Sequence, residues 1–252
     1  MNKKYKFILL LLIVIFAISS FFLIKEILEN KKQNDIYDNL QEIVTKNDKN
    51  DDITEDNGKN TPDDNYNLKN IKNINSDVVG WIKIDGTNID YPVMQNGNYY
   101  LHRNLYKNYS SHGTPYLAEY CKINSSDNLI IYGHHMKDNQ MFSQLDYYKK
   151  YEFYSNHKYI KFYTLEGNET IESKYEVTFV FKTIAYTDKG FKYYNYYDFN
   201  SEDEFNDFVI NCEKLELYNT DIEFKYGDKF ITLSTCEYSQ KNGRMVIVAK
   251  KI

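Results

Sequence analysis

Cys236 is the residue best placed for nucleophilic chemistry, because it directly follows the β-prone run 230–235. A thiol at the end of a strand is held in place by the sheet and faces the rim, where a substrate can reach it. The reactive form is the thiolate, so such a cysteine needs a base or an imidazolium partner close by. A cationic or basic partner is therefore expected at the ends of other predicted strands.

Arg244 follows Cys236 after a turn that contains Asn242 and Gly243. If the runs on either side of this turn pair as a hairpin, Arg244 returns to a position beside Cys236. Arg244 is one of two arginines among 31 basic residues. This scarcity favours a need for the planar, permanently charged guanidinium over a generic positive charge. An ordinary surface arginine is the alternative.

His134 also lies at a predicted strand end, after the run 128–132 and Gly133. In an extended segment His134 and His135 point to opposite sides, so only one of them can readily face Cys236. A lone histidine is more often structural than catalytic. The combination of histidine, cysteine and arginine at three strand ends is much less common by chance.

The other two cysteines, Cys121 and Cys212, are interpreted as small buried side chains. Three cysteines are an odd number, so at least one thiol stays free unless it pairs between chains. No CxxC or HxxxH spacing occurs, and we predict neither a metal site nor a cofactor.

These residues carry a resemblance to the sortases. The segment 233–236 (Leu-Ser-Thr-Cys) is similar to the sortase LxTC signature, 132–134 (Tyr-Gly-His) resembles the segment that holds the sortase histidine, and Arg244 falls where the sortase arginine does. The forms Thr-Leu-Ser-Thr-Cys and Tyr-Gly-His-His, with a long helix ahead of the cysteine strand, resemble class B. The resemblance covers about residues 68–252.

The resemblance implies a mainly β fold, an eight-stranded β-barrel with peripheral helices, and a transpeptidase of the Gram-positive cell surface. Such enzymes cleave a C-terminal sorting signal after Thr, form a thioacyl intermediate on cysteine and pass the acyl group to a peptidoglycan amine. By this resemblance Cys236 is the nucleophile and His134 the acid/base that protonates the leaving amine. Arg244 holds the substrate and stabilises the oxyanion.

The resemblance also implies a substrate groove beside these motifs. Glu237 is followed by Tyr238, where some relatives carry an acid, so no acid-assisted mechanism is expected at that position. Backbone N–H groups near Glu237 are expected to add to the oxyanion hole. The predicted substrate-binding residues are Ser234, Thr235, Tyr132, Glu237 and Leu101. The expected partners are surface proteins with an NPxTx-like or related signal.

Two other classes of function are open at this point. A Cys/His peptidase of the cell wall would use the same thiol with water as acceptor. Papain-like enzymes, however, place the cysteine at a helix N-terminus and ahead of the histidine, the reverse of the order here. The second alternative is a non-catalytic surface binding module.

The predicted elements are mostly strands, as a barrel or sandwich requires. Helices are expected at 26–44, 70–79, 140–148 and from the capping box at 201–204 to about 215. The predicted strands are 79–84, 89–93, 114–120, 128–132, 159–165, 175–186, 229–235 and 245–249.

The N-terminus predicts the location. Residues 1–6 carry three lysines and precede the apolar run 7–24, which spans about 27 Å as a helix and suits a bilayer. We expect a single-pass anchor with a cytoplasmic N-terminus and an extracellular domain; a cleaved signal peptide is the alternative. Residues 25–66 are predicted to be an extracytoplasmic stalk and 67–252 the catalytic domain. The net charge of −5 argues against nucleic-acid binding.

Overall fold

A computed structural model describes residues 3–45, 66–186 and 189–252. It divides into two compact units, residues 1–40 and 41–252. The first consists of most of the helix α1 (Lys3–Thr45), whose last turn belongs to the second unit. The predicted anchor and the predicted helix at 26–44 are thus parts of one helix. The rest of the predicted stalk, residues 46–65, lies outside the described residues.

The helix α1 is long and apolar enough to cross a membrane, and it is the one such helix in the part of the chain that is described. Its apolar side chains from Phe7 to Ile24 are largely exposed, with Phe16 at 73%. A run of this length needs an apolar environment, and the described residues do not supply one.

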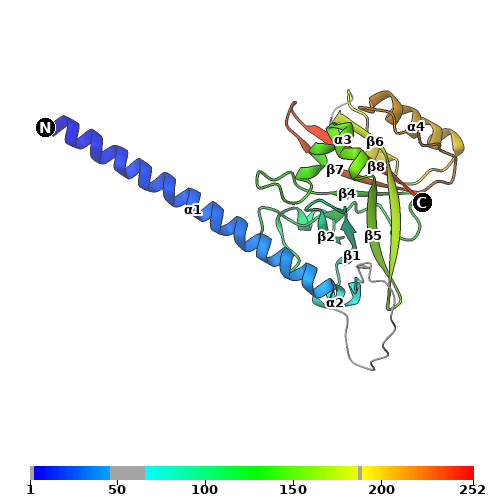
Figure 1. Ribbon diagram of the computed structural model, residues 1–252, viewed down its shortest axis with the longest axis horizontal. Coiled ribbons are helices and arrows are strands. Elements are labelled where there is room, and N and C mark those ends of the chain that lie inside the picture. The colour runs from blue at the N-terminus through cyan, green and yellow to red at the C-terminus, as the bar shows by residue number, and fades with distance from the viewer. Residues whose placement is uncertain (1–2, 46–65, 187–188) are drawn as a thin grey trace. The chain divides into compact units, whose positions relative to one another are not determined.

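The second unit is a closed eight-stranded barrel with short helices around it, as predicted (Figure 1). Going around the barrel, the strand order is β1-β2-β3-β4-β7-β8-β6-β5. The strands are β1 (Val78–Lys83), β2 (Asp90–Met94), β3 (Tyr116–Leu117), β4 (Asn128–Tyr132), β5 (Tyr159–Glu166), β6 (Glu169–Ile184), β7 (Phe230–Glu237) and β8 (Gly243–Lys251). The helices are α2 (Leu68–Ile74), α3 (Tyr151–Asn156) and α4 (Glu202–Leu215), with 3₁₀ turns η1 (Tyr99–His102), η2 (Ser143–Lys149) and η3 (Tyr193–Asn195).

The barrel is closed by strand pairs that include strands far apart in the sequence. The neighbours β4 and β7 run parallel, and their pairing extends from Asn128↔Phe230 to Tyr132↔Ser234. The strands β7 and β8 form the predicted hairpin. The interior is filled by the alternate apolar side chains of these strands, among them the cross-strand neighbours Ile131, Leu233 and Ile247, all fully buried.

Several predicted boundaries were wrong, each for a local reason. The helix predicted at 70–79 ends at Ile74 because the Asn75 side chain turns the chain: its Oδ1 accepts from the Asp77 N–H and its Nδ2 donates to the Tyr100 hydroxyl. The strand predicted at 114–120 is reduced to two residues, Tyr116 and Leu117.

Two further predictions differ in length or type. The expected helix at 140–148 is a 3₁₀ turn, because the Ser143 hydroxyl bonds the Met136 backbone and draws the chain back on itself. The strand β6 begins at Glu169, six residues before its predicted start, because β5 pairs with its first half. The helix α4 begins as predicted, with the Ser201 hydroxyl accepting from the Glu204 N–H.

Candidate active site

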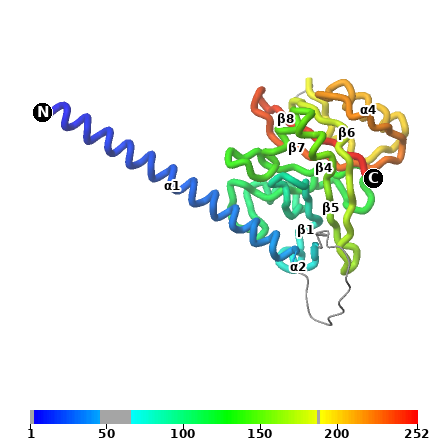
Figure 2. Tube along the Cα trace, viewed as in Figure 1, coloured from blue at the N-terminus to red at the C-terminus, as the bar shows by residue number. Residues whose placement is uncertain are grey.

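Strand register brings the three predicted catalytic residues to one end of three adjacent strands. Cys236 on β7 is the cross-strand partner of Arg244 on β8. The strand β4 runs parallel to β7, and the Gly133 N–H extends their ladder by bonding the Ser234 carbonyl at 3.1 Å. His134 therefore leaves β4 at the same end at which Cys236 lies. Figures 1 and 2 show β4, β7 and β8 side by side.

Cys236 is the accessible thiol among the three cysteines, all of which lie in the described residues. Cys121 and Cys212 are buried as predicted, and burial raises the pKa of the Cys121 thiol to about 11 and that of Cys212 well above its usual value. Cys236 is half-buried at the rim. A thiol that stays protonated in an apolar interior is inert, so this difference in burial leaves Cys236 as the candidate nucleophile.

His134 is held by a backbone carbonyl. Its Nε2 lies 2.7 Å from the Leu101 carbonyl oxygen, which can only accept, so Nε2 carries the hydrogen and donates it. In the neutral ring the lone pair is then on Nδ1, the nitrogen free to exchange a proton. Burial lowers the pKa of His134 and outweighs the opposing effect of the Leu101 hydrogen bond, while the nearby His102 and His112 lower it further.

A close backbone approach fixes that carbonyl. Gly113, with φ of +60°, packs so tightly on it that a Cβ there would lie 2.4 Å from the Leu101 oxygen. Gly133, between Tyr132 and His134, is equally constrained, since its Cβ would lie 2.6 Å from the Phe142 ring. The glycine in the Tyr-Gly-His segment therefore has a packing reason: any side chain would push His134 off its present path.

His135 has a different environment, as the extended-segment argument predicts. Its Nε2 lies 3.6 Å from Asp146 Oδ2, and its ring meets Tyr238 edge-on at 5.1 Å. The two adjacent histidines thus contact different parts of the protein. Only His134 has the Leu101 carbonyl as partner.

Arg244 lies half-buried at the start of β8. One N–H of its guanidinium donates to the Gly243 carbonyl at 2.9 Å, and the group lies 5.5 Å from the Tyr186 ring centre. A guanidinium has five N–H donors, so donors remain for a bound carbonyl or oxyanion. These two contacts hold the guanidinium of Arg244, the cross-strand partner of Cys236.

The predicted groove residues divide between two faces of the sheet, because side chains alternate along a strand. Ser234 lies two residues before Cys236 and so shares its face, and its hydroxyl bonds the Tyr193 hydroxyl at 2.6 Å. Thr235 points the other way. Its hydroxyl is buried and has no hydrogen-bond partner among the described residues.

Glu237 is taken up by contacts within the chain. Its side chain is 3% exposed, Lys149 donates to Oε1 at 2.8 Å, and the Ser239 N–H and hydroxyl donate to Oε2. Burial alone would raise the pKa of Glu237, but these hydrogen bonds outweigh it and lower the pKa to about 2. The carboxylate therefore braces the end of β7. A contribution of backbone N–H groups near Glu237 to the oxyanion hole stays a prediction.

The face that carries the predicted residue Tyr132 also holds Tyr116 and Tyr120, which were not predicted from the sequence. The Tyr116 ring lies 5.6 Å from that of Tyr132, whose hydroxyl is 3.1 Å from the Tyr120 hydroxyl. Burial raises the pKa of Tyr116, as do the charges of Tyr186 and Cys236, against the opposing effect of Arg244. Tyr116 therefore lies beside the candidate pair. The abundance of tyrosine, 26 residues, was visible in the sequence, but not which of them meet at β4.

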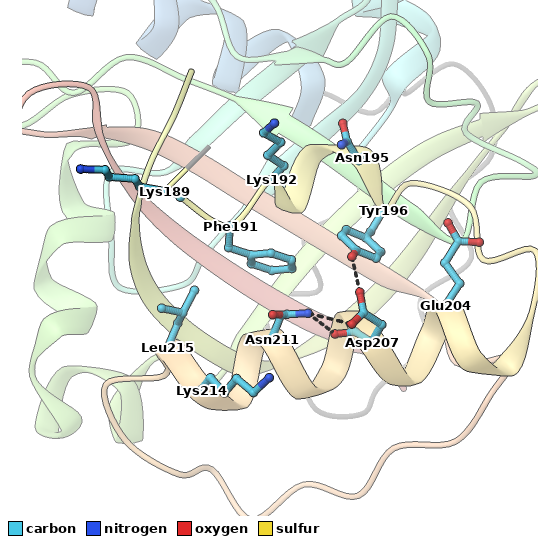
Figure 3. Close-up of a pocket in the computed structure, with 11 residues that line it drawn as sticks. Lys189, Phe191, Lys192, Asn195, Tyr196, Glu204, Asp207, Asn211, Lys214 and Leu215 are labelled. Carbon is cyan, nitrogen blue, oxygen red and sulfur yellow. Dashed lines mark hydrogen bonds between the residues drawn. The ribbon is translucent and has the colours of Figure 1, made fainter. Parts of the chain in front are cut away.

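Two recesses in the described residues differ in their relation to this face. The larger, about 730 Å³, lies between the segment 189–196 and α4, where the rings of Phe191 and Tyr196 cover Asp207 and Asn211 (Figure 3). It contains none of the predicted site residues. The smaller, about 480 Å³, adjoins the face that carries the candidate nucleophile. It is lined by Asn96, Gly97, Asn98, Tyr116, Ala118, Glu119, Tyr120 and Tyr132.

Comparison with known proteins decides the family. The model of the sortase domain matches residues 82–252. The chain belongs to the sortase family. Sortase B of Staphylococcus aureus (strain NCTC 8325 / PS 47) is 30% identical over 263 residues, covering 100% of this chain and 98% of the relative. Sortase B of Listeria monocytogenes serovar 1/2a (strain ATCC BAA-679 / EGD-e) is 31% identical, covering 98% and 96%.

The fold agrees with this assignment. The solved Staphylococcus aureus sortase B–substrate complex matches with a TM-score of 0.72 and 28% identity, covering 89% of this chain and 98% of that one. The resemblance to class B sortases is thus confirmed, and with it the eight-stranded barrel. The protein is a sortase B-type cysteine transpeptidase.

The papain-like alternative does not fit this sortase. Cys236 lies within β7 and not at the start of a helix. The nucleophile of a papain-like peptidase draws on a helix N-terminus to stabilise its thiolate. Here that stabilisation has to come from side chains at the strand ends.

Proposed function

We propose that this sortase cleaves the sorting signal of a surface protein after Thr and joins the new carboxyl end to a peptidoglycan amine. The observation that carries the proposal is the cross-strand pair of Cys236 and Arg244, with His134 at the end of the adjoining parallel strand. The arrangement supplies a nucleophile, a proton carrier and an oxyanion donor at one rim.

In the first half-reaction the Cys236 thiolate attacks the carbonyl carbon of the signal threonine. The oxygen becomes negative, and N–H groups of Arg244 stabilise it together with backbone N–H groups near Glu237. The C–N bond then breaks. The imidazolium of His134 gives its proton to the leaving amine, which departs with the rest of the signal, and a thioester to Cys236 remains.

In the second half-reaction the acceptor amine attacks the thioester. His134, now neutral, takes a proton from the attacking nitrogen, the C–S bond breaks and Cys236 leaves as thiolate. The product is an amide, and the enzyme returns to its starting protonation state. Half-burial of His134 beside the His102 ring supports this course, because less water competes with the amine.

The recess beside Tyr132 supports binding of the signal peptide on the same face. Aromatic rings and the Asn96 and Asn98 amides line it, which suits a short peptide with polar side chains. We propose that Tyr132 and Leu101 contact the signal and that Ser234 supports it through its bond to Tyr193. An NPxTx-like signal is the proposed class.

We propose that α1 anchors the enzyme in the cell membrane, with residues 1–6 in the cytoplasm and the barrel outside. The three lysines before the apolar run support this orientation. The proposed domain boundaries follow: an anchor at 7–24, a connecting segment at 25–66 and a catalytic domain at 67–252. A catalytic barrel outside the cytoplasmic membrane would meet both secreted surface proteins and cell-wall amines.

The proposal is tested with the full chain in detergent micelles. The enzyme is mixed with signal peptides scanned at the first and last positions of NPxTx and with triglycine or a diamino acid as amine, and the products are identified by mass spectrometry. An amide product supports the proposal. An acid product alone would indicate a hydrolase, and no cleavage of any peptide would indicate a binding module.

A further inference from the structure

Four of the chain's five histidines lie around the end of β4, close to the proposed acid/base. His102, the last residue of η1, stacks its ring on that of His134, with centroids 5.5 Å apart and planes 25° from parallel. Leu101, directly before it, supplies the carbonyl that binds His134. One short 3₁₀ turn therefore fixes both the tautomer and the plane of the His134 ring.

His102 differs from the other histidines in this group in its access to water. His112 is fully buried and bound to Asp138, with Nε2 2.7 Å from Oδ2. His135 is turned toward Asp146. His102 is exposed. Histidine is the side chain that changes its charge between about pH 5 and 8, and an exposed one can do so without opening the fold.

The other charged groups near His134 are compensated or belong to the reaction. The Asp138 carboxylate faces His112, so a charge on that ring has a partner at 2.7 Å. The guanidinium of Arg103 is turned away, over the Tyr99 ring. On β7 and β8 the facing groups are Cys236 and Arg244. No carboxylate contacts His102 in the described residues, so a positive charge on it acts on His134 uncompensated.

We propose that His102 is a positioning residue that couples turnover to pH: its stacked ring holds the plane of the His134 imidazole, and its positive charge, once it is protonated, disfavours protonation of His134. The inference rests on the proposed function, since it assumes that His134 must carry a proton to the leaving amine. Two imidazolium rings stacked at 5.5 Å repel each other. At acid pH less of the working imidazolium of His134 would thus be present than in a protein without the charge on His102.

Two variants separate the ring from the charge. In His102→Phe the stacked ring stays and the charge is lost, and in His102→Gln both are lost. We expect both variants to retain more of their own pH 8 activity at pH 5.5 than the wild type does, on the order of 10-fold more, the size of one nearby like charge. Only His102→Gln should also lower kcat at pH 8, with KM little changed. The control is His157→Phe, a histidine stacked on Phe153 away from this group, which should keep the wild-type pH profile.

The titration of His134 is followed independently by NMR of ¹³C-labelled histidine in the full chain in micelles. The pKa of His134 should be higher in His102→Gln than in the wild type, because a positive neighbour is gone. This measurement needs no sorting signal, so it tests His102 even if the proposed function fails. The proposal would be overturned if the His134 titration were unchanged, or if activity fell with acid in the same way in all variants. Its positioning part would be overturned if the Gln and Phe variants had equal kcat at pH 8.

Discussion

The hydrogen bond to the Leu101 carbonyl distinguishes His134 from its neighbour His135. It gives His134 a defined tautomer, whereas His135 faces Asp146 and the Tyr238 ring. In the sequence, strand alternation allows only one of the two histidines to face Cys236, and the resemblance of the Tyr-Gly-His segment to sortases selects His134. The sequence alone could not identify the partner, because Leu101 lies 33 positions earlier in the chain.

His134→Ala should therefore damage transfer far more than His135→Ala. Loss of a general acid/base typically costs ~10²–10⁴-fold in rate. We expect a loss in this range for His134→Ala, measured as kcat/KM for a fluorogenic signal peptide. His135→Ala should stay within a few-fold of the wild type. Equal losses in the two variants would point to a structural pair and would contradict the assignment.

Arg244 offers a second comparison at the scale of one residue. If it bridges the substrate and the oxyanion with two N–H groups, Arg244→Lys should fail, because lysine offers a point charge on a flexible stem. We expect a loss on the order of 10²-fold or more in kcat, as for removal of one oxyanion donor. The rate of Cys236 alkylation by iodoacetamide serves as the control. Similar alkylation with low turnover places the defect in the transition state, and near-normal transfer by the lysine variant would rule the role out.

Among the elements, the end of β7 is braced by η2. Lys149 donates to both Asp146 and Glu237, and Glu237 is the residue after Cys236. The sequence placed Glu237 in the groove because it neighbours the motif. Its real partner lies 88 positions away in a 3₁₀ turn, which no local pattern reveals.

Lys149→Met should destabilise the barrel by about 1–3 kcal/mol, because it leaves the buried Glu237 carboxylate without its cation. The free energy of unfolding is measured by urea titration at pH 7. Lys150→Met, which changes the next residue, is the matched control and should shift stability by less than about 0.5 kcal/mol. Equal stability of the two variants would show that the brace has no energetic role.

The Glu237 carboxylate also makes the free energy of unfolding depend on pH in the acid range. The folded-state pKa of Glu237, about 2, lies below the ordinary value of 4.5, so its contribution to stability is present above about pH 4.5 and is lost as pH falls toward 2. Lys149→Met should flatten this part of the curve of unfolding free energy against pH, because one of the hydrogen bonds that lower the pKa is removed. Parallel curves for variant and wild type between pH 5 and 2 would contradict this account.

For the whole molecule, the pattern of apolar residues predicted the strands but not which strands pair with each other. The runs at 128–132 and 230–235 were recognisable as strands, and both were found. Their parallel pairing closes the barrel and puts His134 beside Cys236, yet it joins segments about a hundred residues apart. The β7–β8 hairpin was predictable because the turn between its strands is short. The helix α3 was missed, since six residues carry too little periodicity.

We infer that these strand ends form one acyl-transfer site on Cys236, and trapping the covalent intermediate is the direct test. The full chain in micelles is mixed with a signal peptide in the absence of an acceptor amine, quenched in acid, digested and analysed by mass spectrometry. The account predicts an acyl adduct that ends in threonine on the peptide containing Cys236, lost on addition of triglycine and absent in Cys236→Ala. An adduct on Cys121 or Cys212, or amide product formed by Cys236→Ala, would contradict it.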